Sequence, residues 1–216
     1  MTSPKDKKKK TVLIFGGSGQ LGNLIFNQYD QEKYTVINIS ARKKLEISGV
    51  INIQADITTK LGLLYSSFRL RSLIETIDVV VLASMFIYHK DLFSLTKKEL
   101  THEFDVNVFS QIECIKMIMN IFWKTEEGEV RTFLYISSAA SLGLTTRKDL
   151  ESYTLEKQSF NGVAHYFEPF LSKRNINTLL YLPGSLSEGS VRDALYNAFW
   201  IDILDKTKNG IKKRVF

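Results

Sequence analysis

The fold is decided by the stretch Thr11-Val12-Leu13-Ile14-Phe15-Gly16-Gly17-Ser18-Gly19-Gln20-Leu21-Gly22. Its first five residues are apolar or β-branched and predict a buried strand, and an amphipathic helical pattern begins at Leu21. Between them, the spacing Gly16-x-x-Gly19-x-x-Gly22 allows a tight turn and a close backbone approach to a ligand. The N-terminus of the following helix offers free amides and positive potential, which suit a pyrophosphate. We therefore expect a phosphate-binding turn here, the alternative being a glycine turn that binds nothing.

The rest of the chain alternates short apolar runs with helical patterns. We expect strands over Thr11–Phe15, Thr35–Ile39, Val50–Ile53, Asp78–Ala83, Arg131–Ser137 and Ile176–Leu182. We expect helices over Leu21–Tyr29, Thr59–Thr76, Thr96–Trp123, Glu151–Lys173 and Val191–Leu204. Such alternation predicts an α/β fold, a doubly wound parallel sheet of the Rossmann type with helices on both faces. Residues 1–10 are expected to be a disordered basic tail, and residues 11–216 one nucleotide-binding domain with a short C-terminal segment on the substrate side.

The positive charge of the chain is concentrated at its two ends and therefore does not indicate a nucleic-acid-binding surface. A net charge of +6 and a pI of about 9.2 would alone suggest a nucleic-acid partner. However, residues 1–10 carry +4 and residues 207–216 another +4, which leaves −2 between them. We therefore expect no nucleic-acid partner. The single cysteine, Cys114, and the lack of an apolar run long enough to span a membrane favour a cytoplasmic protein with no membrane contact.

The end of the second expected strand indicates which dinucleotide binds. An acidic residue there would bind the ribose hydroxyls of NAD. This chain instead has Ser40-Ala41-Arg42-Lys43-Lys44, and Arg42 lies twenty residues after Gly22. A guanidinium at that place can hold a 2′-phosphate through paired hydrogen bonds, so we favour NADP over NAD. The alternative is that these basic residues form an ordinary solvated loop.

Three further residues are typical of a carbonyl-reducing site. Tyr153 and Lys157 are four apart in a helical pattern and therefore share one face. Ser138 follows the fifth expected strand, at the sheet edge where ligands of α/β proteins bind. An ammonium and an oxidised nicotinamide close to Tyr153 would lower the pKa of its phenol, which could then exchange a proton with a carbonyl oxygen. Ser138 would donate a hydrogen bond to the same oxygen.

With these residues, the chain resembles the short-chain dehydrogenase/reductase family from Thr11 to about Glu188. Similar in position to family motifs are Asp56 within Ala55-Asp56-Ile57-Thr58, Asn107, and the pair Pro183-Gly184. The resemblance implies that Asp56 faces the adenine, that Pro183 and Gly184 lie beside the nicotinamide, and that Ile57, Ala83 and Ser84 also bind the cofactor. It also implies that Asn107 holds a water in a proton relay to Lys157, and completes a tetrad with Ser138 and Tyr153.

The sequence departs from the family pattern in two places. Met85 stands where many members have glycine, which puts a side chain near the nicotinamide ribose, and only 32 residues follow Gly184, which predicts an open substrate site. We expect an NADP-dependent enzyme that interconverts a small-molecule carbonyl and a secondary alcohol. The alternatives are an enzyme like a nucleotide-sugar reductase or epimerase, or a non-catalytic sensor or scaffold that binds NADP(H).

The histidines and the aromatic residues of the chain bear on metal binding and on self-association. Three scattered histidines have no ligand spacing, so no metal site is expected. The resemblance implies a homodimer or homotetramer that packs through the two long helices. An aromatic stripe on the second of these, Phe160, Tyr166, Phe167 and Phe170, agrees with such an interface.

Overall fold

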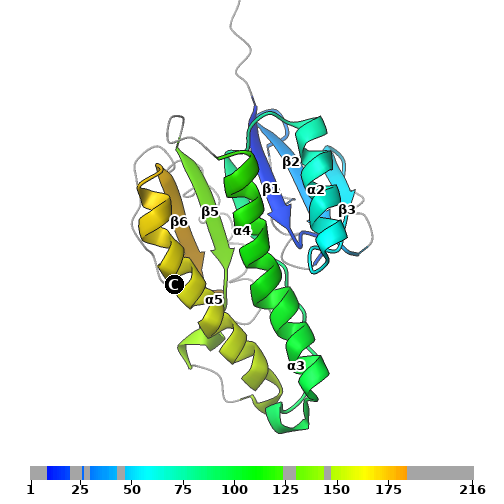
Figure 1. The fold of residues 1–216 in the computed structure, drawn as a ribbon, viewed down its shortest axis with the longest axis vertical. Helices are drawn as coiled ribbons and strands as arrows, with labels where there is room; N and C mark the ends of the chain where they lie inside the picture. The colour runs from blue at the N-terminus through cyan, green and yellow to red at the C-terminus, as the bar shows by residue number, and fades with distance from the viewer. Residues whose placement is uncertain are drawn as a thin grey trace, which may run out of the picture.

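The protein is built around one parallel sheet. The computed structural model describes residues 9–19, 26, 30–42, 47–123, 130–143 and 147–183. Within them, six parallel strands lie in the order β3-β2-β1-β4-β5-β6 (Figure 1). Their bounds are β1 Lys10–Phe15, β2 Tyr34–Ser40, β3 Val50–Gln54, β4 Val79–Leu82, β5 Arg131–Ile136 and β6 Ile176–Tyr181. Each agrees with the expected strand to within one residue at either end, and the strand order is that of a Rossmann fold.

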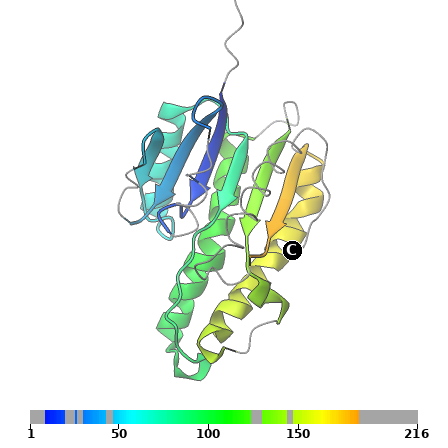
Figure 2. The same ribbon diagram turned by 180° about the vertical axis from the view of Figure 1, so that it is seen from behind.

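Both faces of the sheet are apolar, as the uniform strand sequences predict. On β1, Leu13 and Phe15 belong to one buried cluster, whereas Val12 and Ile14 belong to a second cluster on the opposite face. The first face is covered by α2 (Lys60–Leu73), α4 (Ser110–Ile121) and α5 (Glu151–Ser172), which lie in front of the sheet in Figure 1 and behind it in Figure 2. Phe26 packs into the second cluster. The expected helices over Leu21–Tyr29 and Val191–Leu204 lie outside the described residues.

The long helix expected over Thr96–Trp123 contains a local irregularity. It begins as α3 (Lys97–Phe104) with the predicted capping box, in which Thr96 and Glu99 bond reciprocally. A π-turn over Asp105–Phe109 then joins α3 to α4. Such one-turn π segments occur often at functional sites, and this one contains Asn107. The end of the helix is fixed by Trp123, whose indole Nε1 donates to the Ile77 carbonyl at 2.9 Å.

No helix among the described residues is long and apolar enough to cross a membrane.

The expected aromatic stripe on α5 is only in part a surface feature. Phe160 is fully buried in the core and Phe167 is partly buried against it, whereas Tyr166 and Phe170 are exposed. Phe160 is inside because it packs on Tyr135 of β5, with ring centroids 5.4 Å apart.

The turn between β3 and α2 leaves no room for a side chain at Gly62. Thr59 caps α2 by accepting a hydrogen bond from the Gly62 amide at 3.0 Å. A Cβ at Gly62 would lie 1.9 Å from the carbonyl oxygen of Asp56, which is backbone and cannot move without the turn. In contrast, a Cβ at Gly162, in α5, would meet nothing within 4 Å.

We therefore predict opposite effects for two glycine-to-alanine substitutions. Gly62→Ala should lower the free energy of unfolding by about 1–3 kcal/mol, as overpacking does. Gly162→Ala should raise it by about 0.5–1 kcal/mol, because alanine favours the helix. Urea unfolding of both variants measures the difference. Equal stabilities would contradict the close packing of the Asp56 turn.

Candidate functional site

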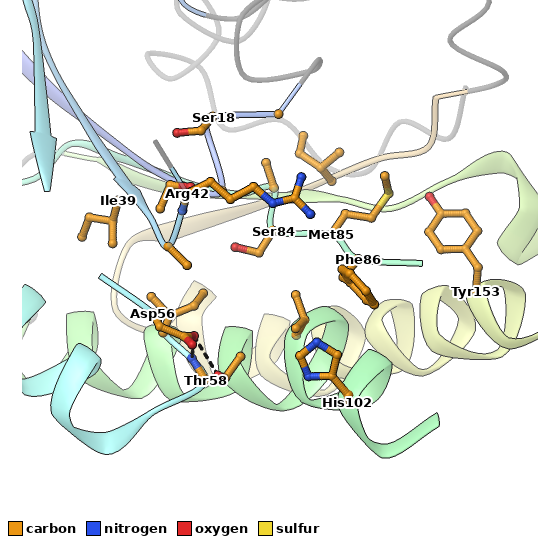
Figure 3. Close-up of a pocket in the computed structure, with 18 of the residues that line it drawn as sticks. Ser18, Ile39, Arg42, Asp56, Thr58, Ser84, Met85, Phe86, His102 and Tyr153 are labelled. Atoms are coloured by element: carbon orange, nitrogen blue, oxygen red, sulfur yellow. Dashed lines mark hydrogen bonds between the residues drawn. The ribbon is translucent and has the colours of Figure 1, made fainter. Parts of the chain in front are cut away.

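A pocket of about 630 Å³ lies at the carboxyl ends of the strands. Figure 3 shows Arg42 and Asp56 towards one end of it and Tyr153 at the other, with Ser84, Met85 and Phe86 between them. Most of the residues predicted from the sequence line this one pocket: Gly16, Ser18, Gly19, Arg42, Asp56, Ile57, Ala83, Ser84, Tyr153, Lys157 and Pro183. Ser138 and Asn107 are not among its lining residues. Gln20, Leu21, Gly22 and Gly184 lie outside the described residues.

The glycine turn is shaped by a close approach between two backbones. Gly16 has a φ of +83°, which disfavours any residue with a side chain. A Cβ there would lie 2.5 Å from the Ser84 Cα, so the end of β1 packs directly on the segment that follows β4. At Gly19 the nearest atom to a Cβ would be 3.7 Å away. Gly16 is therefore required by the packing of the protein itself, whereas no close contact within the described part of the chain requires glycine at position 19, which lines the pocket.

A buried asparagine that the sequence reading missed supports this turn. Asn38, in the middle of β2, is 2% exposed, and its Nδ2 donates to Ser18 Oγ at 3.1 Å and to Asn52 Oδ1 at 3.0 Å. A Cβ at Gly17 would lie 2.5 Å from the Asn38 side-chain oxygen. The signal for Asn38 was present in the sequence as one amide within an otherwise apolar strand.

One end of the pocket carries one acidic and one basic side chain. The Asp56 carboxylate accepts from the Thr58 amide at 3.0 Å and from the Thr58 hydroxyl at 2.7 Å, which fixes its direction (Figure 3). Arg42 is exposed, and its backbone amide donates to Ser40 Oγ at 3.3 Å. Its guanidinium lies along the pocket in Figure 3. The two residues lie at the ends of neighbouring strands, as predicted.

At the other end, Tyr153 and Ser138 form a pair. Tyr153 is in the first turn of α5 and is 9% exposed. Burial raises the pKa of its phenol, a hydrogen bond with Ser138 lowers that pKa, and the charge of Glu156 raises it. The net direction is upward, because burial outweighs the hydrogen bond. The lowering that an ammonium and an oxidised nicotinamide would cause stays a prediction.

The Lys157 ammonium bonds to the sheet. Its Nζ donates to the carbonyl of Ile136, at the end of β5, at 3.0 Å, and lies 5.6 Å from the centre of the Tyr153 ring. The side chain is 2% exposed. Burial lowers the pKa of Lys157 to about 8, while the nearby Glu156 raises it. Lys157 in the pocket wall therefore stays mostly protonated at neutral pH but loses its charge at a lower pH than an ordinary lysine does.

Asn107 lies behind the pocket wall. Its side-chain oxygen accepts from the Phe86 amide at 2.8 Å, and its Nδ2 donates to the Phe86 carbonyl at 2.7 Å and to a carboxylate oxygen of Glu156. Its backbone carbonyl accepts from Gln111 Nε2 at 2.8 Å. Gln111 also donates to the Ser84 carbonyl at 3.1 Å. Asn107 thus ties the segment after β4 to α5, and the predicted water relay stays a prediction.

Two buried carboxyl groups beside Asn107 were not identified from the sequence. Glu103 and Glu156 are both fully buried. The available signals were the spacing of Glu103 and Asn107, four apart on one helix, and the position of Glu156 directly before Lys157. Across the part of the chain that the structure describes, no group of acidic, histidine or cysteine side chains is arranged to hold a metal ion.

Comparison with known proteins identifies the fold. No protein-family model matches the chain, and no curated protein sequence matches it. Solved structures do. A short-chain dehydrogenase from Leptospira borgpetersenii, solved with bound NAD⁺, superposes with a TM-score of 0.75 at 20% identity, over 93% of this chain and 82% of that one.

Two other solved structures extend this likeness. An NADH-dependent reductase, A1-R′, complexed with NAD, has a TM-score of 0.81 at 14% identity, over 94% of this chain and 91% of that one. The RhlG/NADP active-site complex of Pseudomonas aeruginosa has a TM-score of 0.73 at 17% identity, over 82% and 73%. The chain therefore has the fold of the short-chain dehydrogenase/reductase structures, as its motifs predicted.

The buried lysine predicts a distinctive pH dependence of stability. Between about pH 8 and pH 10.5, the ordinary pKa of lysine, the unfolded chain holds the Lys157 proton and the folded protein does not. Raising the pH through this window should therefore stabilise the wild type relative to Lys157→Met, by roughly 3 kcal/mol at most. Urea unfolding across the window measures this. Lys173→Met, at an exposed position after α5, should show no such trend; a trend shared by both variants would refute the assignment.

Proposed function

We propose that this chain is an NADP(H)-dependent oxidoreductase that interconverts a carbonyl and a secondary alcohol on a small molecule. The observation that carries the proposal is that Tyr153 and Lys157 line the same pocket as the Gly16 turn, with Ser138 hydrogen-bonded to Tyr153. The dinucleotide site and the acid/base group that we propose would therefore share one continuous space. The fold of the solved NAD- and NADP-bound structures supports the proposal.

The residues present fit a dinucleotide. Gly19 lines the pocket and has no side chain, so a diphosphate could approach the backbone of the turn there. Asp56 and Ile57 would hold the adenine end, with Ala83, Ser84 and Pro183 along the remainder. Lys157 would bond to the nicotinamide ribose. A bound nicotinamide supplies or accepts the hydride.

The protein's own part of the chemistry is proton transfer at the Tyr153 oxygen. The raised pKa of its phenol keeps the proton on oxygen at neutral pH, which suits donation to a carbonyl that is being reduced. Ser138 would donate a hydrogen bond to the same carbonyl oxygen and orient it. In the reverse direction the phenol must lose its proton, and a Lys157 ammonium close to the ring favours that step.

Replacing Tyr153 by phenylalanine tests the acid/base role. We expect the rate of carbonyl reduction to fall by about 10²–10⁴-fold, the usual contribution of a positioned proton donor, with NADPH affinity unchanged. The assay follows NADPH absorbance with a panel of carbonyl compounds, and NADPH affinity is followed by fluorescence. Tyr166→Phe, on the same helix at an exposed position, is the matched control and should turn over normally.

The same assay separates the alternatives. NADPH binding without reduction of any carbonyl would favour a sensor or scaffold, a reading that agrees with the Met85 side chain in the pocket wall. Reduction or epimerisation of a nucleotide sugar alone would favour the second enzyme class. Turnover preserved in Tyr153→Phe would contradict the assigned role of the phenol.

Arg42 should decide between the two dinucleotides. Its exposed guanidinium at the end of β2 would pair with a 2′-phosphate, and charge-assisted hydrogen bonds contribute about 1.5–3 kcal/mol. Arg42→Ala should therefore weaken NADPH binding by about 10- to 100-fold and leave NADH binding nearly unchanged. Arg71→Ala, at an exposed position in the last turn of α2, is the control. An unchanged ratio of the two affinities in Arg42→Ala would contradict NADP selectivity.

We also propose that two copies associate through α4 and α5. Four exposed apolar side chains lie on α5 and on the π-turn before α4: Phe109, Leu155, Tyr166 and Phe170. Burial of exposed apolar side chains against a partner would favour association. A homodimer or homotetramer would bury them.

A further inference from the structure

Glu103 and Glu156 form a buried carboxyl pair, joined by a hydrogen bond between their side chains, where α3 packs against the helix that carries Tyr153 and Lys157. Glu103 is on α3 and Glu156 is on α5, and both side chains have no exposed surface. Each carboxyl uses one oxygen as an acceptor. Glu103 Oε1 accepts from the Tyr88 amide at 2.6 Å, and Glu156 Oε2 accepts from Asn107 Nδ2.

The remaining oxygen of each carboxyl lacks a hydrogen-bond donor among the described residues, which gives Glu103 and Glu156 a reason to pair. Glu103 Oε2 and Glu156 Oε1 are buried, and neither accepts a hydrogen bond from any donor in the described part of the chain. Two ionised carboxylates buried together would each lose their hydration and repel one another. One proton held between these two oxygens would satisfy both and leave a single negative charge. The same arrangement of two carboxyls with one proton occurs where like charges are too close for both to ionise.

The hydrogen bonds of this cluster converge on one segment of the pocket wall. After β4 the chain runs through Met85 and Phe86, which line the pocket. Asn107 bonds to both the amide and the carbonyl of Phe86, and Glu103 bonds to the amide of Tyr88. Glu156 lies on α5, three residues after Tyr153, and its bonds with Asn107 and Glu103 connect both of these residues to that helix. The wall is thus held by buried polar groups of α3, the π-turn and α5, not by a strand pairing.

We propose that Glu103 and Glu156 share one proton, and that the protonated pair holds the Met85–Tyr88 wall against the helix that carries Tyr153 and Lys157. Both glutamates are positioning residues, because they act on the pocket through Asn107 and the backbone of Phe86 and Tyr88. Loss of the shared proton puts two negative charges in the cluster and releases the wall. The inference goes beyond the proposed function, since it requires neither a dinucleotide nor turnover.

The charges around the pair agree with this assignment. Burial raises the pKa of Glu156 to about 8, helped by the charge of Glu103 and the hydrogen bond with it, and partly offset by Asn107 and by the Lys157 charge. Among the described residues, two other titratable groups are connected to the cluster: Tyr153 on α5, which is affected by the Glu156 charge, and His102, which packs on the Phe86 ring. A carboxyl with a raised pKa stabilises the fold at low pH and loses that contribution as the pH rises through about 8. Release of the wall is therefore an alkaline event.

Hydrogen exchange of two backbone amides tests the proposal directly. The Phe86 and Tyr88 amides donate to the network, so their protection reports the state of the wall. After correction for the intrinsic exchange rate, we expect their protection in the wild type to fall at least tenfold between about pH 7 and pH 9.5. Amides of β4 should keep theirs. A carboxyl signal that titrates near pH 8 should appear in ¹³C spectra of the wild type.

Two conservative variants separate a shared proton from simple packing. In Glu156→Gln, the amide nitrogen can donate to Glu103 and the amide oxygen can accept from Asn107, which reproduces the protonated pair at every pH. In Glu103→Gln, the amide nitrogen can donate to an ionised Glu156. We expect both variants to keep Phe86 and Tyr88 protected up to about pH 9.5 and to lose the titration near pH 8. Glu113→Gln, at an exposed position on α4, should behave like the wild type.

Three results would overturn the proposal: wild-type protection independent of pH, a Glu156→Gln variant with the wild-type pH dependence, or no carboxyl that titrates well above its ordinary range. None of these results depends on NADPH or on a substrate. An inactive protein that showed the predicted exchange would therefore count against the proposed function alone, and an active one without it would count against the shared proton alone.

Discussion

The site depends on the close contact between the end of β1 and the segment that follows β4. Parallel pairing of these strands brings Gly16 onto the backbone of Ser84, where even a Cβ would lie 2.5 Å from the Ser84 Cα. Only glycine fits such an approach at a φ of +83°. The glycine turn therefore opens towards the carboxyl edge of the sheet, and the segment after β4 forms part of the pocket wall. The Gln111 side chain holds this segment in place by donating a hydrogen bond to the Ser84 carbonyl.

Buried charge is the second determinant of the site, and it opposes stability. Lys157, Glu103 and Glu156 have almost no exposed surface, so each ionised form loses its hydration. The protein offsets this cost with specific partners: the Ile136 carbonyl for the ammonium, and Asn107 for Glu156. Burial raises the pKa of Glu156 to about 8 and lowers that of Lys157 to about 8, and such shifts are typical of functional sites. Helix α5 carries two of these groups and Tyr153, so the position of this helix determines where three titratable side chains lie relative to the pocket.

The sheet and most of the pocket could be predicted from sequence because their signals are local. Apolar runs placed the six strands to within a residue, and the edge of a parallel sheet collects the residues that follow each strand, such as Arg42 and Asp56. The buried network was not predictable in the same way. Glu103 and Glu156 are distant in sequence and look like surface glutamates on amphipathic helices. The burial of Phe160 depends on its tertiary contact with Tyr135. The raised pKa of Tyr153 likewise depends on how deeply Tyr153 itself is buried, which its sequence neighbours do not determine.

A crystal structure of the protein grown with NADP⁺ tests the central claim most directly. The account predicts a diphosphate at the Gly16 turn, a 2′-phosphate against Arg42, and a nicotinamide ring within reach of the Tyr153 oxygen and Lys157. A dinucleotide bound elsewhere, or one whose nicotinamide is kept away from Tyr153 by Met85, would contradict it.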